Sequence, residues 1–436
     1  AATPRKPEEK AKILRNGEMR KLMQAKQLAN PDARVTLEEN LDMELLERYS
    51  TSLQGIASGD NGHFSRCFWE MPSIDSKIWI YQQSTVLKSV MYGGRENVLY
   101  WQNGNGELAS SYAARIQGLD GWGCGGVAVS QMRQLPVTLY TGDAFDINTA
   151  AIVVRKPEHL VALWCYCSSP EYGKNVRQID QALKVTNATL VKVPFDLDYW
   201  TQVAAENYPN GLPKPYSNDP TQWIFHGHPA PSEQPLQVAV ARLLGYQWPA
   251  EMDEQMELSE EARAWIARSR ELNQMADTDG IVCIPAVRGE APASERLLNL
   301  VAKAYPDQDV QAKVSELLSQ ADHAGGTLEA WLRNKFFAQH CKVFQQRPFI
   351  WHIWDGLPDG FAALVNYHKL DRKNLESLTY TYLGDWIQRQ KADIAAGVDG
   401  ADDRLAAAET LKKSLELILQ GEAPLDIFVR WKPLEQ

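Results

Sequence analysis

The 436-residue chain lacks several features that would decide its class at once. No apolar run approaches the roughly 18 residues that a membrane-spanning helix needs, so the sequence predicts no segment that crosses a bilayer. The six cysteines are scattered and include no Cys-x-x-Cys pair, which argues against a disulfide framework and against a zinc site. The first residues are polar and lack the apolar core of a signal peptide. Together these absences indicate a protein of the reducing cytoplasm.

The motifs of several common enzyme classes are also missing. The chain contains no GxxxxGK[ST], GxSxG or HExxH string. The glycine-rich stretch 121–126 matches no phosphate-loop spacing and is predicted to be a turn or a close-packing loop. His226 and His228 could share a strand face, but they have no acidic or cysteine partner at a fixed spacing, so structural hydrogen bonds are favoured over a metal site. Cys165 and Cys167 lie in an apolar run and are predicted to be buried thiols.

Negative charge is unevenly distributed along the chain. The formal net charge is −10, of which residues 201–345 carry −7 and residues 51–200 only −1. Segment 51–200 is therefore neutral enough to form a local basic groove, although no segment is basic enough to predict tight DNA binding by this chain alone. The sequence also contains 14 tryptophans, a residue type that is often used at binding faces.

The pattern of apolar residues predicts an α+β fold, and the length predicts two or three domains. Helices are expected at 5–29, 36–54, within 161–184, and at 236–245, 257–275, 293–304, 310–321, 326–344, 372–394 and 401–420. Strands are expected at 77–82, 97–101, 126–130, 151–156, 189–195, 280–285 and 347–356, with 361–368 as a hairpin partner of the last. Residues 201–240 are predicted to be mainly a long loop.

Polar residues in 55–200 suggest a nucleic-acid surface. The turn Gly59-Asp60-Asn61-Gly62 precedes Arg66, and Asn and Arg are the residues that read adenine and guanine edges. Further cations alternate with aromatic residues, as in a groove where cations meet phosphates and rings meet bases. The cations are Lys77, Lys88, Arg95, Arg115 and Arg133, and the aromatic residues are Trp79, Tyr81, Tyr92, Tyr100 and Trp101. A half-buried sheet with one solvated face gives the same pattern, so both interpretations stay open.

Several long strings resemble one protein family. They are GIASGDNGHFSRCFWE (55–70), YGGRENVLYWQNGNGEL (92–108), GWGCGGVAVS (121–130), NATLVKVPF (187–195) and the stretch 347–386. Each resembles the target-recognition region of large adenine-specific DNA methyltransferases, the single-chain enzymes of type IIG restriction–modification and of BREX and DISARM phage defence. The DISARM methylase is the most similar of these. The ending DIFVRWKPLEQ (426–436) resembles the point after which such chains continue for a short tail.

The sequence departs from that family in its catalytic motifs. Those enzymes carry a [DNS]PP[YFW] motif, whereas here Asn30-Pro31 is followed by Asp32 and Asp219-Pro220 by Thr221. The FxGxG-type loop for S-adenosylmethionine is also missing. We therefore expect the catalytic domain to precede residue 1, and the chain to be cropped or split from it. On this interpretation the chain holds no catalytic residue, metal or cofactor of its own, S-adenosylmethionine belongs to the parent enzyme, and the chain alone is inactive.

The resemblance implies an organisation and a set of partners. It implies a helical linker at 1–54, a target-recognition domain at 55–200, an acidic, mainly helical insertion at 201–345, return strands at 346–371, and a helical pair with a tail at 372–436. The expected partners are double-stranded DNA, a methylase domain or subunit, and other defence-system subunits. The predicted DNA contacts are Asp60, Asn61, Arg66, Lys77, Lys88, Arg95, Trp101, Arg115, Gly123, Gly125 and Arg133. The alternative is a non-catalytic protein-interaction scaffold of a defence complex, which would show no salt-dependent affinity for duplex DNA.

Overall fold

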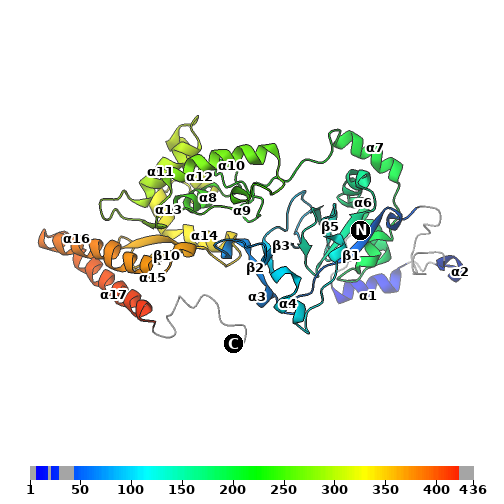
Figure 1. Ribbon diagram of the computed structural model, residues 1–436, viewed down its shortest axis with the longest axis horizontal. Helices are drawn as coiled ribbons and strands as arrows, with labels where there is room; N and C mark the ends of the chain where they lie inside the picture. Colours follow the sequence, from blue (N-terminus) through cyan, green and yellow to red (C-terminus); the bar gives the residue numbers. More distant parts are fainter. Residues whose placement is uncertain (1–5, 18–20, 29–43, 422–436) are drawn as a thin grey trace. The chain divides into compact units, whose positions relative to one another are not determined.

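The chain divides into two compact units built from interleaved segments. The computed structural model describes residues 6–17, 21–28 and 44–421. Unit 1 comprises Ala1–Ile56, Thr85–Met91 and Gln117–Leu212, and unit 2 comprises Ala57–Ser84, Tyr92–Ile116 and Pro213–Gln436. The segment 55–200, expected as one recognition domain, is therefore distributed over both units. The described residues form helices together with small, mainly antiparallel sheets, which confirms the predicted α+β class (Figure 1).

Unit 1 is organised around an antiparallel sheet. Its described strands pair in the order β1 (Ser50–Gln54), β8 (Thr149–Val154), β5 (Gly126–Ser130) and β6 (Val137–Tyr140), and β7 (Ala144–Phe145) precedes β8. All five residues of β5 are buried, because this strand has a neighbour on each edge and helix α5 (Leu160–Cys167) packs against it. Its sequence is accordingly a continuous run of small and apolar residues instead of an alternating one.

The helices of unit 1 begin at the residues that their capping chemistry predicts. The Ser169 side chain accepts from the Tyr172 N–H at the start of α6 (Pro170–Ile179), and Asp196 caps α7 (Leu197–Asn207) in the same way. Cys165 and Cys167 are buried in α5, as predicted. The remaining described elements are α1 (Pro7–Asn16), α2 (Gln24–Gln27) and 3-10 turns at Leu46–Arg48, Leu119–Gly121, Pro157–His159 and Asn187–Val191.

Unit 2 begins with a small antiparallel sheet. Within unit 2, β4 (Asn97–Tyr100) pairs antiparallel with β2 (Ser65–Cys67) on one edge and with β3 (Trp79–Gln83) on the other. Helix α3 (Asn61–Phe64) runs directly into β2, and 3-10 turns at Phe68–Glu70 and Gln102–Gly104 and helix α4 (Glu107–Ser110) complete this part.

A helical layer follows in unit 2 and encloses the largest core. Its helices are α8 (Pro235–Leu243), α9 (Pro249–Met252), α10 (Glu260–Leu272), α11 (Ala293–Ala304), α12 (Val310–Gln320), α13 (Leu328–Asn334) and α14 (Phe336–Val343), with a 3-10 turn at Asn273–Met275. Trp248 and Trp331 are fully buried here. Phe68 and Trp69, which follow β2, belong to the same core, so the small sheet and the helical layer fold as one body.

A second sheet separates this core from the C-terminal helices. Strands β10 (Ile350–Trp354), β11 (Ala362–Asn366) and β9 (Ile281–Cys283) pair antiparallel in that order. Leu364 faces the helical layer, whereas Ala363 and Val365 face a second core, as the two-residue period of a strand requires. That core is covered by α15 (Arg372–Glu376), a π-helical turn (Ser377–Tyr382), α16 (Leu383–Ala395) and α17 (Ala401–Gln420), and a 3-10 turn lies at Tyr367–Lys369. Helices α16 and α17 pack side by side (Figure 1).

The predicted return strands pair within unit 2. Both β10 and β11 belong to the sheet with β9, and not to the sheet of β2, β4 and β3. They are nevertheless connected to the segment after β2, because the Trp69 Nε1–H donates to the Arg347 carbonyl at 3.1 Å and Arg347 pairs with Glu70 at 2.7 Å.

Four sequence predictions differ from the structure in the described residues. The predicted helix 5–29 is interrupted, because α1 ends at Asn16 and residues 21–23 are not helical. In the predicted helix 36–54, residues 50–54 form β1, because Ser50, Thr51 and Ser52 are weak helix formers and pair with β8; residues 36–43 lie outside the described residues. The predicted strand 189–195 begins in a 3-10 turn, and its strand pairing is limited to an isolated bridge between Pro194 and Leu45. The predicted helix 326–344 is divided at Lys335 into α13 and α14. Among the described helices, none combines the length and apolarity needed to cross a bilayer.

Candidate nucleic-acid interface

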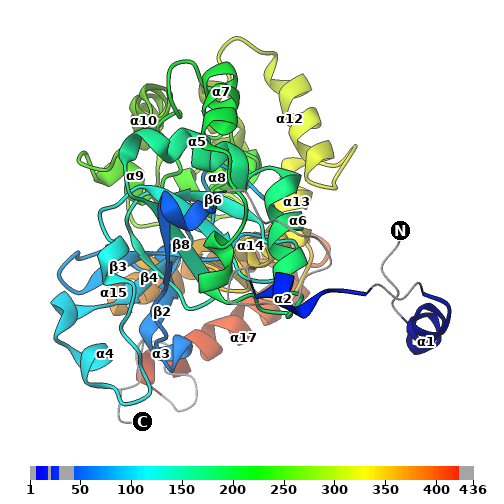
Figure 2. The same cartoon turned by 90° about the vertical axis from the view of Figure 1, so that its right-hand side faces the viewer.

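The strand register of the small sheet in unit 2 decides where most predicted DNA contacts lie. Ser65 pairs with Leu99 and Trp79 pairs with Tyr100, so the residues before β2, before β3 and after β4 meet at one end of the sheet. Figure 1 and Figure 2 both show α3 and α4 together at this end, and His63 Nε2 lies 3.5 Å from the Glu107 carboxylate. We call residues 57–66, 77–79, 100–107 and 111–115 the α3 end of the sheet.

The turn before α3 is held in a single conformation. The Asp60 carboxylate accepts from the His63 N–H at 3.1 Å and caps the helix. Gly59 has φ +77°, and a Cβ on it would lie 2.7 Å from the Cβ of Ala113, so only glycine fits here. The Ser58 hydroxyl donates to Asn61 Oδ1 at 2.6 Å. Asn61 is exposed, and its amide nitrogen has no hydrogen-bond partner among the described residues, which leaves two donors facing outward.

Three of the predicted cations lie at the α3 end. Arg66 is half-buried, and its guanidinium donates to the carbonyl groups of Gly62 and Ser65, which fixes it beside the turn. Arg115 is exposed and is tied to the turn through its backbone N–H, which donates to the Ala57 carbonyl at 2.7 Å. Lys77 is exposed next to Ile78, whose carbonyl accepts from the Trp101 N–H at 2.8 Å.

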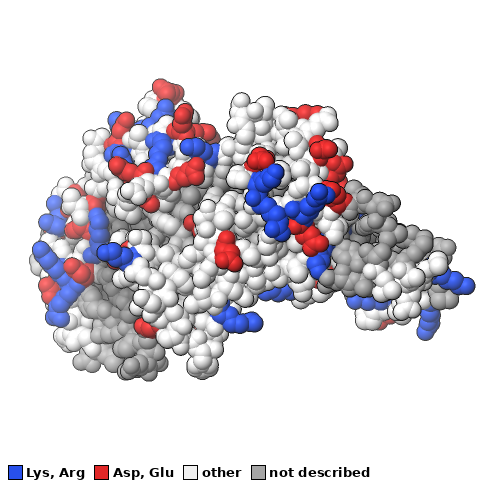
Figure 3. Space-filling view, turned by 45° about the vertical axis from the view of Figure 1, so that its right-hand side comes forward, with Lys and Arg blue, Asp and Glu red and all other residues white. Residues whose placement is uncertain are grey.

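Carboxylates lie among these cations. Asp60, Asp75 and Glu107 belong to the same region, and Asp75 accepts from the Lys77 N–H at 3.0 Å. The α3 end is therefore a mixed polar surface and not a strongly basic one. On the face drawn in Figure 3, basic and acidic side chains are likewise interspersed, and much of the surface carries neither.

The structure adds an aromatic residue that sequence reasoning missed. Tyr112 is fully exposed, at 103% of its reference area, in the segment that packs against Gly59. An exposed ring of this kind can stack on a nucleic-acid base. The sequence signal was weak, because Tyr112 is a single aromatic residue in the short polar stretch SSYAAR. Trp101, which was predicted, is half-buried with its ring against Gly104.

Arg95 lies at the opposite end of the sheet and inside the core. Cys67 pairs with Asn97, which places residues 95 and 96 away from α3. The Arg95 side chain is 1% exposed, and its guanidinium lies 5.6 Å from the Tyr92 ring and 5.3 Å from the Trp223 ring. A phosphate would reach it only after this core opened. The cation–aromatic pattern around residue 95 therefore has a packing explanation.

Four of the predicted contacts belong to unit 1. Lys88 is exposed in a segment that runs beside β6, where the Val90 N–H donates to the Val137 carbonyl at 3.1 Å. Gly123 and Gly125 are exposed in the loop before β5, and a Cβ on Gly123 would meet open space. Arg133 is exposed in the connection from β5 to β6. The structure thus brings six of the eleven predicted residues together at the α3 end and places four in unit 1.

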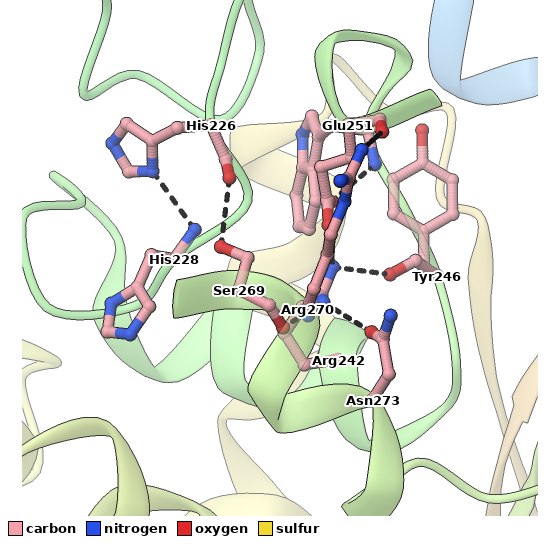
Figure 4. Close-up of polar contacts among 9 residues, drawn as sticks. His226, His228, Arg242, Tyr246, Glu251, Ser269, Arg270 and Asn273 are labelled. Carbon is pink, nitrogen blue, oxygen red and sulfur yellow. Dashed lines mark hydrogen bonds and ion pairs between the residues drawn. The ribbon is translucent and has the colours of Figure 1, made fainter. Parts of the chain in front are cut away.

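His226 and His228 form hydrogen bonds within a buried loop (Figure 4). His226 Nδ1 accepts from the His228 N–H at 3.0 Å, and His228 Nδ1 accepts from the Ala230 N–H at 3.1 Å. Burial lowers the pKa of His226 to about 3 and the pKa of His228 to about 4, so both rings are neutral acceptors at physiological pH. Across the described residues, no group of three or more His, Cys, Asp or Glu side chains is arranged to hold a metal ion.

An ion pair beside this loop connects three segments of unit 2. Arg242 Nη1 lies 2.7 and 2.6 Å from the two Glu251 oxygens, and both side chains are 1% exposed. The Arg242 Nη2 donates to the Ser269 carbonyl. The Ser269 hydroxyl in turn donates to the His226 carbonyl at 2.9 Å (Figure 4). This network holds the 226–230 loop against α8 and α10, which is a structural role.

A polar hollow in the helical layer holds none of the predicted site residues. It has a volume of about 330 Å³ and lies between α8, α12, α13 and α14. Gln339 on its wall is already paired with the Trp331 indole and the Ala321 carbonyl.

No family model and no curated protein sequence matches the chain.

Proposed function

We propose that this chain binds duplex DNA as the target-recognition portion of an N6-adenine DNA methyltransferase of a bacterial restriction–modification or phage-defence system. The supporting observation is that the string 55–70, which carries the resemblance, contributes residues 57–66 to the α3 end. There, polar, cationic and aromatic residues from separate stretches of sequence are exposed together. A catalytic domain outside this chain would bind S-adenosylmethionine and flip the adenine, because N6 is inaccessible inside the stacked duplex.

Each residue type at the α3 end suits one part of a DNA duplex. Lys77 and Arg115 are exposed cations that would contact phosphates and set the register. Asn61 presents amide donors to a base edge, since its oxygen already accepts from Ser58. Tyr112 would pack its ring against a base or sugar. With neighbouring carboxylates and few phosphate contacts, the expected affinity of the chain alone is moderate.

Salt dependence of duplex binding tests the proposal. The full chain is titrated into a fluorescently labelled duplex at several salt concentrations, and the affinity is read from anisotropy. We expect log affinity to fall linearly with log salt, and Lys77→Ala and Arg115→Ala each to reduce that slope by about one. The matched control is Lys303→Ala, which removes an exposed lysine from the last turn of α11. A slope of zero for the parent protein would favour the interaction-scaffold alternative.

A second pair of variants tests whether the exposed ring of Tyr112 contacts DNA. Tyr112→Ala should weaken duplex binding about tenfold, since stacking on one base contributes roughly 1–3 kcal/mol. Tyr199→Ala is the control, because Tyr199 is a 55% exposed tyrosine on α7. Equal affinities for the two variants would remove Tyr112 from the interface.

Incubated alone with labelled S-adenosylmethionine and duplex, the chain should transfer no methyl group. Turnover above background would place the catalytic machinery within this chain.

A further inference from the structure

The connection between β5 and β6 in unit 1 has an unusual backbone. Residues 131–136 link the two strands, and within them Arg133 has φ 58° and Leu135 has φ 57°. Residues with a Cβ are strained in this left-handed region, where glycine is normally used. Such strain persists only where the surroundings fix the loop, and it is found preferentially in binding loops.

The surroundings fix this connection from two sides. On one side, Arg177 of α6 donates from Nη2 to the Arg133 carbonyl at 2.7 Å. On the other, Gln131 and Val185 exchange hydrogen bonds, with the Val185 N–H donating to the Gln131 carbonyl at 2.9 Å and Gln131 Nε2 to the Val185 carbonyl at 3.0 Å. Leu135 is 2% exposed and anchors the loop in the core. The loop is thus rigid before any partner binds.

This rigid loop carries three consecutive exposed residues, Met132, Arg133 and Gln134. Arg133 and Gln134 are adjacent and both exposed. Beside them, Lys184 forms an isolated bridge with Met132, and its ammonium donates to the Ile147 carbonyl at 2.9 Å. We call residues 131–135 and 181–185, with Lys174 and Arg177 of α6, the β5–β6 ridge.

The ridge presents mainly cations and apolar groups outward. Lys174 is exposed one turn before Arg177 on α6, and Leu183 is 81% exposed. The carboxylate of Asp180, the residue that follows α6, accepts from the N–H groups of Ala182 (2.9 Å) and Thr186 (3.4 Å). Glu171, in the first turn of α6, is the other carboxylate of this helix.

From this arrangement we infer that the β5–β6 ridge enters the major groove of duplex DNA and that Arg133 and Gln134 read base edges there. Arginine matches guanine O6 and N7 with two parallel hydrogen bonds, and glutamine matches adenine N6 and N7. Lys174 and Lys184 lie on the flanks, where phosphates would be. A loop that is already ordered loses little conformational entropy on binding, which favours readout over a flexible contact. The inference rests on the proposed DNA function and adds residues that determine sequence preference.

The test uses the full chain and a pool of duplexes with a randomised segment. Bound duplexes are separated and sequenced for the parent protein and for Arg133→Gly, Arg133→Lys, Gln134→Ala and the control Gln202→Ala on α7. Glycine keeps the backbone conformation, so Arg133→Gly removes the guanidinium without straining the loop. We expect the parent to enrich defined bases. Each ridge variant should lose about 10- to 100-fold of the discrimination at one position, with neighbouring positions unchanged.

The lysine substitution separates base readout from charge. Lysine keeps the positive charge of residue 133 but cannot form the two-bond fork, so Arg133→Lys should keep the overall affinity and lose the preference for its base. Lys184→Ala should reduce the salt slope by about one and leave base preference unchanged. Circular dichroism and the urea midpoint establish that each variant is folded.

The outcomes distinguish this inference from the function on which it rests. If the parent protein has no affinity for duplexes, the proposed function fails and the ridge assignment fails with it. If the parent binds but enriches no bases, or if Arg133→Gly and Gln134→Ala enrich the same sequences as the parent, the ridge assignment is overturned while DNA binding stands. Loss of preference in the ridge variants, together with loss of affinity in the α3-end variants, supports both.

Discussion

Replacing Glu251 with glutamine should strongly destabilise unit 2. Glutamine has nearly the same shape as glutamate, but the charge that balances Arg242 disappears. Arg242 cannot lose its proton, and its side chain is 1% exposed, so it would remain a buried charge whose other partners, the carbonyls of Tyr246 and Ser269 and the amide oxygen of Asn273, are all uncharged. Removing one member of a buried ion pair costs about 3–5 kcal/mol, mainly because the other charge stays buried without its partner.

That loss is a large fraction of the free energy of unfolding, which is about 5–15 kcal/mol for a typical domain. Urea unfolding followed by tryptophan fluorescence measures it, because fully buried Trp248 donates its backbone N–H to Glu251 at 2.9 Å. With a urea dependence of about 2–3 kcal/mol/M for a unit of this size, the midpoint of the unit 2 transition should fall by roughly 1–2 M.

Two further variants test whether buried Arg242 depends on the charge of Glu251. Glu254→Gln breaks an ion pair with Arg270 at 3.7 Å whose side chains are 83% and 52% exposed, and it should cost less than about 1 kcal/mol. The double replacement of Arg242 by methionine and Glu251 by leucine should recover most of the lost stability, since no unpaired charge remains. A Glu251→Gln protein that unfolds within about 1 kcal/mol of the parent would refute the view that Arg242 depends on this partner.

Three other predictions concern the turn before α3, the ridge and pH. Gly59→Ala should lower the free energy of unfolding by about 1–3 kcal/mol and weaken duplex binding, because the added Cβ would overlap Ala113. An unchanged urea midpoint and an unchanged affinity would mean that the turn relaxes. Arg133→Gly should leave the stability of unit 1 equal or raise it by up to about 1 kcal/mol, since it relieves a left-handed residue; a clear loss of stability would contradict the assigned strain. Burial lowers the pKa of His340 to about 3 from an ordinary 6.5, so protons bind the unfolded state and stability falls as pH drops below about 6.5. His340→Gln should flatten that decline in urea midpoints between pH 6.5 and 4, and parallel curves would argue against a neutral buried ring.

Local sequence patterns were sufficient for the elements whose signal is local. Helix 293–304 was predicted with its observed bounds, because Ala293, Leu297, Leu300, Val301 and Ala304 repeat at the helical period and are all buried. Strand β5 was predicted because a short apolar run between glycine and polar residues fits a buried strand. Asp60 and the turn that follows it were also recognisable, since Asp and Gly have specific roles at helix starts and tight turns.

The candidate site, by contrast, depends on pairing between distant segments. Arg66 and Arg95 are both cations of the segment 55–200, yet the register of β2 with β4 places one at the exposed α3 end and the other in a core against Trp223. Residues 50–54 form a strand only because β8, about 100 residues later, offers an edge to pair with. The left-handed backbone at Arg133 likewise requires a hydrogen bond from Arg177. The periodicity of apolar residues indicates which residues of one helix or strand are buried. Whether a given cation is exposed depends on which distant strand covers it, and that pairing is set only by the tertiary structure.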